Sequence, residues 1–221
     1  AAAALALANT KGLGGLSIAA VARCVGLVPS AVYRHFRSKG EILEGLIGLI
    51  RGRLLHNVEL VHAETADPAA QLESLLMRHI ALIRENQGIL RVLVAEDLHG
   101  GQPARRREIY GGIHGYVDEV ARIIRAGQAQ GQFAAAADAD AAAVLFLGLI
   151  MPPLIRWHLS DGAFDVTRQA RRAWPLFRRA LGASGPAAGR RRRPSTKREA
   201  QEEEAARCAV AGGGRRGGRG P

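Results

Sequence analysis

The chain has 221 residues, of which 48% are hydrophobic and 5% are aromatic, and its formal net charge is +11. This composition suffices for a buried core, and its many alanines favour helices over sheets. It excludes a disulfide framework and shows no metal-ligand spacing, because Cys24 and Cys208 are the only cysteines. We therefore expect no metal and no cofactor, and a reducing, cytoplasmic location.

Much of the positive charge lies at the end of the chain. The segment from Gly185 to Pro221 holds ten Lys or Arg and four Glu, a net charge of +6, which leaves +5 for the other residues. This segment has almost no apolar side chain, so burial cannot offset the entropy of ordering it, and we expect it to be disordered. A basic excess favours nucleic acid or an anionic surface as a partner, but the tail supplies over half of it.

The sequence predicts a soluble protein without a membrane partner. The opening residues Ala1–Ala8 lack the basic region and cleavage pattern of a signal peptide. The longest uncharged run, Ala141–Ile155, contains Pro152 and Pro153 and is too short to span a bilayer.

Helix signals recur along the chain and predict nine helices. The first three are 1–11, which ends before Gly12; 18–24, which Ser17 caps; and 29–36, which Pro29 opens. The other six are 40–62, 68–86, 87–98, 103–130, 138–158 and 165–181. The expected fold class is therefore all-α.

Residues 17–39 carry the most information about function. Two short helices separated by a turn with Gly26 are typical of a helix-turn-helix. On a helical wheel of the second of these helices, Val32 and Phe36 share one face, which we expect to pack on the preceding helices. Ser30, Ala31 and Arg34 lie on the opposite face and point outward.

This outward face suits a DNA groove. Small side chains at its centre allow close approach to base edges, while Tyr33 and His35 on the flanks reach phosphates. Lys39, just past the helix, adds a charged phosphate contact. The guanidinium of Arg34 matches guanine N7 and O6, and a phosphate contact is the alternative for this residue.

Residues 3–47 resemble the DNA-binding head of the tetracycline-repressor (TetR) family of transcriptional regulators. The resemblance rests on Gly12, Ser17-Ile18, Gly26 and the Tyr-x-His-Phe-x-Ser-Lys segment from Tyr33 to Lys39. It implies phosphate contacts for Tyr33, His35 and Lys39, and base contacts for the start of the third helix. Where the family has Ser or Thr before that helix, this chain has Val28, which provides no side-chain cap. The residues expected to bind DNA are Ser17, Pro29, Ser30, Ala31, Tyr33, Arg34, His35 and Lys39.

The body is expected to dimerise and to bind a ligand. The predicted helix 138–158 is apolar nearly all round, so it needs cover on two sides, and the last helix has an apolar stripe. By resemblance, this pair of helices forms half of a four-helix interface. The expected interface residues are Leu147, Met151, Leu154, Ala170, Trp174, Phe177 and Leu181. The expected pocket residues are Met77, Ile80, Leu93, Tyr110, His114, Phe146 and Trp157.

Together these features predict a three-helix DNA-binding head (1–47), a ligand-binding and dimerisation body of about six helices (48–184) and a disordered tail (185–221). The expected function is a dimeric repressor that binds a palindromic operator in double-stranded DNA and is released by a small hydrophobic ligand. Two alternatives stay open: a helical enzyme that binds a small molecule, for which no catalytic constellation is visible, and an architectural protein that binds nucleic acid through the Arg/Gly tail.

Overall fold

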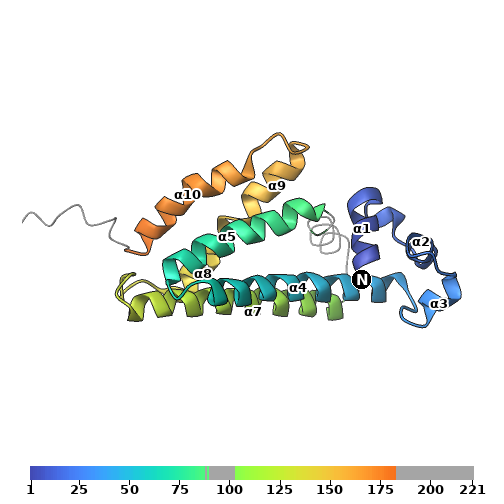
Figure 1. The fold of residues 1–221 in the computed structure, drawn as a ribbon, viewed down its shortest axis with the longest axis horizontal. Helices are drawn as coiled ribbons and strands as arrows, with labels where there is room; N and C mark the ends of the chain where they lie inside the picture. The colour runs from blue at the N-terminus through green and yellow to red at the C-terminus, as the bar shows by residue number, and fades with distance from the viewer. Residues whose placement is uncertain (88, 90–102, 183–221) are drawn as a thin grey trace, which may run out of the picture. The chain divides into compact units, whose positions relative to one another are not determined.

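The structure is a computed structural model that describes residues 1–87, 89 and 103–182 (Figure 1). The head consists of α1 (Ala2–Lys11), the 3-10 turn η1 (Leu13–Gly15), α2 (Ile18–Cys24) and α3 (Pro29–Tyr33). The body consists of α4 (Lys39–Glu64), α5 (Pro68–Glu85), α7 (Pro103–Ala129), α8 (Ala139–Gly148), α9 (Met151–Leu159) and α10 (Val166–Ala180). No strand occurs in these residues, which confirms the predicted all-α class.

The described residues all belong to one compact unit. The predicted disordered tail and most of the predicted helix 87–98 lie outside the described residues. The expected boundary between head and body at residue 47 falls inside α4, which runs unbroken from Lys39 to Glu64. Head and body are therefore joined by one helix rather than by a flexible linker.

A single apolar core extends from the head through the body. Leu5, Ile18 and Val32 contribute to it from the head, and α4 continues it into the body. There, α4 contacts both α5 and α7, and Figure 1 shows α4 and α7 side by side along their lengths. Phe146 of α8, which is fully buried, packs edge-on against Phe177 of α10 at 5.8 Å between ring centroids.

The predicted helix 138–158 is in fact two helices, α8 and α9, with a break at Leu149 and Ile150. Pro152 and Pro153 cause the break, because proline has no N–H to bond the carbonyls one turn earlier. Both prolines fit the first turn of α9, where those N–H groups have no helical partner.

By length and composition alone, the segment Ala139–Leu159 is apolar enough to cross a membrane. The structure gives another reason for its apolar character. Phe146, Ile150 and Leu154 are completely buried in the core of the body. The segment is thus divided into two helices, and its apolar side chains serve in part to fill the protein interior.

The packing around Gly127 gives a test of the body. A Cβ at this position in α7 would overlap the ring of Phe133, which is 4% exposed. We expect Gly127→Ala to lower the free energy of unfolding by about 1–3 kcal/mol, because an overpacked core must shift. Gly111→Ala in the same helix is the control, since nothing lies within 4 Å of its Cβ position.

Alanine at 111 should raise the free energy of unfolding by about 0.5–1 kcal/mol through its helix propensity. Urea unfolding at one fixed protein concentration measures both variants. Equal effects of the two substitutions would contradict the packing of Phe133 on α7.

Candidate DNA-binding site and the helical body

The turn between α2 and α3 is held by local hydrogen bonds. Ser17 caps α2, as predicted, and its Oγ accepts a hydrogen bond from the N–H of Ala20 at 3.1 Å. At the other end, Gly26 has a φ of 69°, and the N–H of Leu27 donates to the carbonyl of Ala22 at 2.9 Å. This is the Schellman arrangement, which requires a left-handed residue and so favours glycine at position 26.

The structure confirms the predicted buried face of α3 and, except for the half-buried Ala31, its outward face. Val32 is 4% exposed and Phe36 is half-buried against the core, whereas Ser30 and Arg34 are exposed. The helix itself ends at Tyr33 rather than Phe36, because the chain must turn toward the start of α4. Arg34 therefore lies at the C-terminal end of α3, and the first turn holds only small or apolar side chains.

All eight residues predicted to bind DNA lie on the head. Seven of them are exposed, and Ala31 is half-buried. The exposed residues are Ser17, Pro29, Ser30, Tyr33, Arg34, His35 and Lys39. They come from the N-cap of α2, from α3 and the two residues after it, and from the first residue of α4, so they lie on one small domain.

The start of α4 is fixed by a capping pair. Ser38 Oγ accepts from the N–H of Glu41 at 3.2 Å, and Glu41 Oε2 accepts from the N–H of Arg37 at 2.7 Å. Lys39 makes a contact that the sequence did not indicate: its Nζ donates to the carbonyl of Leu13 at 2.7 Å. One of its three donors thus ties α4 to the first residue of η1, and two remain for another acceptor.

The charge of the head favours an anionic partner. Residues 1–47 contain five Lys or Arg (Lys11, Arg23, Arg34, Arg37 and Lys39) and two acidic residues (Glu41 and Glu44), a net charge of +3. Both acidic residues belong to α4, and Glu41 is engaged in the capping pair. The segment from Ser17 to Lys39 therefore carries only positive formal charges.

An arginine of the body reaches the head-side end of α4. Arg105, near the start of α7, is 6% exposed, and its Nη2 lies 3.1 Å from the position that a Cβ of Gly40 would occupy. Gly40 thus leaves room for the guanidinium beside Ser38. The sequence could not single out this residue, since it is one of three consecutive arginines that resemble a solvated run.

A buried polar pair joins α5 to α7. Nδ1 of His79 and the hydroxyl of Tyr116 are 3.0 Å apart, and the two rings meet edge to face at 5.1 Å. Burial lowers the pKa of His79 from 6.5 to about 4 and raises the pKa of Tyr116, so both groups are neutral at physiological pH. His79 was one of several scattered histidines in the sequence, and nothing in the spacing indicated its partner.

The predicted pocket residues that the structure describes differ in burial, and the hollows that described residues line do not bring them together. Ile80 and Phe146 are buried in the core, Met77 is half-buried, and Leu93 lies outside the described residues. Tyr110 and His114 are exposed and stack on each other at 5.8 Å, so the sequence placed them wrongly in the interior. Both lie on the outer face of α7, which a helical wheel alone could not distinguish from a pocket face.

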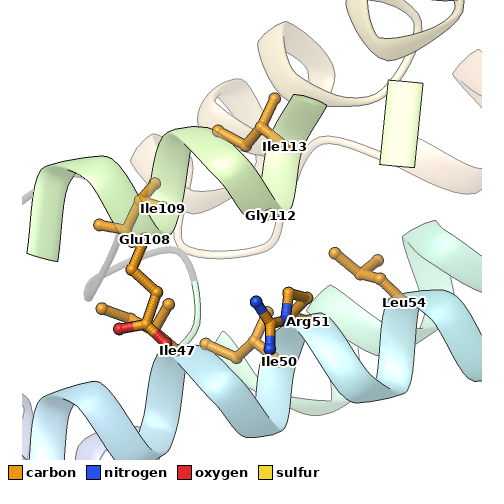
Figure 2. A pocket seen from close by; sticks show the side chains of 8 residues that line it. All are labelled: Ile47, Ile50, Arg51, Leu54, Glu108, Ile109, Gly112 and Ile113. Atoms are coloured by element: carbon orange, nitrogen blue, oxygen red, sulfur yellow. The ribbon is translucent and has the colours of Figure 1, made fainter. Parts of the chain in front are cut away.

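Several hollows border the described body helices. Trp157 lines a cavity of about 330 Å³ together with Arg84, Phe164 and Thr167. A second, apolar hollow of about 60 Å³ lies between α4 and α7 (Figure 2). Its lining residues are Ile47, Ile50, Arg51, Leu54, Glu108, Ile109, Gly112 and Ile113. No group of His, Cys, Asp or Glu able to hold a metal ion occurs in the part of the chain that the structure describes.

Most residues predicted for the dimer interface are covered by their own chain. Leu154, Ala170, Trp174, Phe177 and Leu181 are at most 5% exposed, and Leu147 and Met151 are half-buried. The exposed large apolar side chains of the same helices are Val144 and Leu145 in α8, Ile155 and Leu159 in α9 and Leu176 in α10, and all of them except Ile155 are at least 60% exposed. The apolar face that the sequence assigned to the dimer interface is therefore the face that packs on the protomer's own body.

Comparison with known families identifies the chain. Residues 1–46 match the family of bacterial regulatory proteins named tetR, and residues 65–181, more than half of the chain, match the tetracyclin repressor-like C-terminal domain. The chain belongs to the TetR family of transcriptional regulators. It is thus a ligand-responsive DNA-binding regulator of a family whose members act as dimers and are generally not enzymes.

Individual relatives agree with this assignment. The TetR family regulator PfmR from Thermus thermophilus is 28% identical, with a TM-score of 0.64 over 80% of this chain and 96% of that chain. The regulator FadR from Bacillus subtilis, solved with stearoyl-CoA, shares the fold at 18% identity and a TM-score of 0.68, over 81% of this chain and 96% of that one. The nucleoid occlusion factor SlmA of Escherichia coli is 26% identical over 181 residues, which are 80% of this chain and 90% of SlmA.

The pair of His79 and Tyr116 predicts a pH dependence of stability. The folded-state pKa of His79 is lowered to about 4. The neutral imidazole therefore makes its full contribution to the free energy of unfolding above pH 6.5, and this contribution is lost as the pH falls toward 4. In this window the unfolded chain takes up a proton that the folded core excludes. The loss should total on the order of 3 kcal/mol, at up to about 1.4 kcal/mol per pH unit.

Urea unfolding between pH 7 and 4 measures the effect. His79→Gln should flatten the profile in this range, and His62→Gln, at an exposed position of α4, is the matched control. If His79→Gln and the wild type showed the same dependence of stability on pH, the buried neutral imidazole would be contradicted.

Proposed function

We propose that this regulator is a homodimeric cytoplasmic repressor that binds a palindromic operator and is released from it by a small hydrophobic effector. One observation carries the proposal: a capped helix-turn-helix with a basic outward face is joined to the body by the unbroken helix α4. Two heads related by a two-fold axis read two half-sites one helical turn apart, or a multiple of it, which a single head cannot do.

The head divides its contacts with DNA between the two ends of α3. Residues at the N-terminal end of a recognition helix contact base edges, so Pro29, Ser30 and Ala31 face the bases. Tyr33 and His35 at the other end, with Lys39 and Ser17, contact phosphates. The position of Arg34 at the C-terminal end of α3 favours the phosphate over the guanine contact for this residue.

The dimer interface consists of the exposed apolar side chains of α8 and α10. Val144, Leu145 and Leu176 are 60%, 62% and 60% exposed in one protomer. Large exposed apolar side chains on ordered helices are typical of a surface that a partner covers. Because a two-fold interface brings the same patch together from both copies, these side chains cover one another.

Release by an effector follows from the contacts of α7. This helix bonds to α5 through Tyr116, lies along α4, and places Arg105 against Gly40 at the head-side end of α4. An effector that binds among the body helices and shifts α7 therefore changes the position of the head. A hydrophobic effector is supported by the apolar lining of the hollow between α4 and α7 and by FadR, which was solved with stearoyl-CoA.

The first test is selection of bound duplexes from a random DNA pool by the full chain. We expect a palindrome whose half-site centres lie about 10 base pairs or a multiple apart. Arg34→Ala should weaken binding to the selected duplex and reduce the slope of log affinity against log salt by about two per dimer. Arg179→Ala, an exposed arginine of α10, is the control and should keep the slope. If the selection recovered no preferred sequence, the proposed repressor function would be wrong.

The second test concerns the dimer. Leu145→Asp should raise the dissociation constant of the dimer at least about 100-fold, because the symmetric interface buries the new carboxylate twice. Light scattering measures the molar mass, and binding to the selected duplex should fall in parallel. Tyr110→Asp, at an equally exposed position of α7, is the control. An unchanged dimer in Leu145→Asp would exclude this surface as the interface.

A further inference from the structure

The head exposes large apolar side chains next to its recognition helix. Val25, Leu27 and Val28 are 45%, 53% and 64% exposed, although apolar residues elsewhere in the head, such as Ile18 and Val32, are buried. These three residues make up the end of α2 and the turn before α3. The exposure is thus confined to the part of the head that a DNA groove would receive.

The local structure fixes these side chains in place. The hydrogen bond from the N–H of Leu27 to the carbonyl of Ala22 closes the turn, and Gly26 supplies the left-handed residue that it needs. Their exposure is therefore a feature of a hydrogen-bonded turn rather than of a frayed end.

Val28 is a poor choice for the stability of α3. It is the N-cap residue of this helix and makes no side-chain cap hydrogen bond. Ser, Thr, Asp or Asn at an N-cap stabilises a helix, because the side-chain oxygen accepts a free backbone N–H. A β-branched apolar side chain at an exposed capping position breaks this rule, and such departures are expected at functional sites.

The chemistry of this end of α3 restricts what it can read. From Leu27 to Ala31, only Ser30 has a polar side chain, so no residue here can form a bidentate hydrogen bond to a base. The apolar feature of the major groove is the C5-methyl group of thymine, which apolar side chains recognise by contact.

We propose that Val28 determines sequence specificity by contacting thymine methyl groups in the major groove. This inference rests on the proposed function, because it requires the first turn of α3 to face the bases. Continuity with the predicted phosphate contacts favours DNA over a protein as the partner of the patch. Ser30 and Ala31 follow Val28 on the same short helix, and Tyr33 lies one turn further on.

The test uses the duplex that the full wild-type chain selects from a random pool. Each thymidine of a half-site is replaced in turn by deoxyuridine, which removes the methyl group and keeps the base pair. At one or two positions we expect an affinity loss of about fourfold for one half-site and roughly fifteenfold for both, from the burial of one methyl group in each.

The variant Val28→Ser separates recognition from folding. Serine restores a side-chain cap, so the head should be at least as stable as in the wild type while both methyl groups of Val28 are lost. At the sensitive positions, this variant should bind the thymine and uracil duplexes equally. Leu159→Ser, a 78% exposed position of α9, is the matched control and should retain the preference for thymine.

Several outcomes overturn the inference. If the selected half-sites contained no thymine, or if replacing thymine by uracil left the affinity unchanged at every position, recognition of methyl groups would be excluded. The proposed repressor function would still stand in both cases. A thymine preference that persists in Val28→Ser would assign the contact to another residue. If Val28→Ser without DNA had a different molar mass from the wild type, the exposed apolar side chains of the head would form a contact between copies of the chain. Failure to bind any duplex would overturn the proposed function as well.

Discussion

The structure depends on a single helix that belongs to both parts of the protein. α4 has 26 residues, a length of about 39 Å, and its first turn is fixed in the head by the capping pair of Ser38 and Glu41. Ile42 is completely buried near its start, and Val61 is completely buried near its end. Because a packed helix moves as a rigid element, the direction of the head is set by the way the body packs on α4.

The body reaches this helix from one side through α7, which lies along α4 and carries Arg105 to its head-side end. The hollow of about 60 Å³ between the two helices shows that their contact is not filled completely (Figure 2). Farther along α7, Tyr116 is bonded to His79 of α5. α7 thus contacts both the interior of the body and the head-side end of α4, so it is the element through which the two parts can be coupled.

Two groups of exposed apolar side chains mark the surfaces where partners are expected. One contains Val25, Leu27 and Val28 in the head, and the other contains Val144 and Leu145 in the body. Both lie on ordered helix ends or helix faces, where a soluble chain would gain stability from polar side chains. Their chemistry fits the two kinds of partner that the family uses, a DNA groove and a second copy of the chain.

The sequence by itself determined the features that depend on three or four neighbouring residues: the cap at Ser17, the turn at Gly26 and the buried face of Val32. It could not determine whether the apolar stripe of the last helix meets its own core or a second copy, so it assigned Trp174 and Phe177 to a partner although the protomer buries them. Nor could it find the bond between Lys39 and Leu13, which are 26 residues apart. Periodicity shows that a face is apolar, but only the packed tertiary structure decides which neighbour covers it.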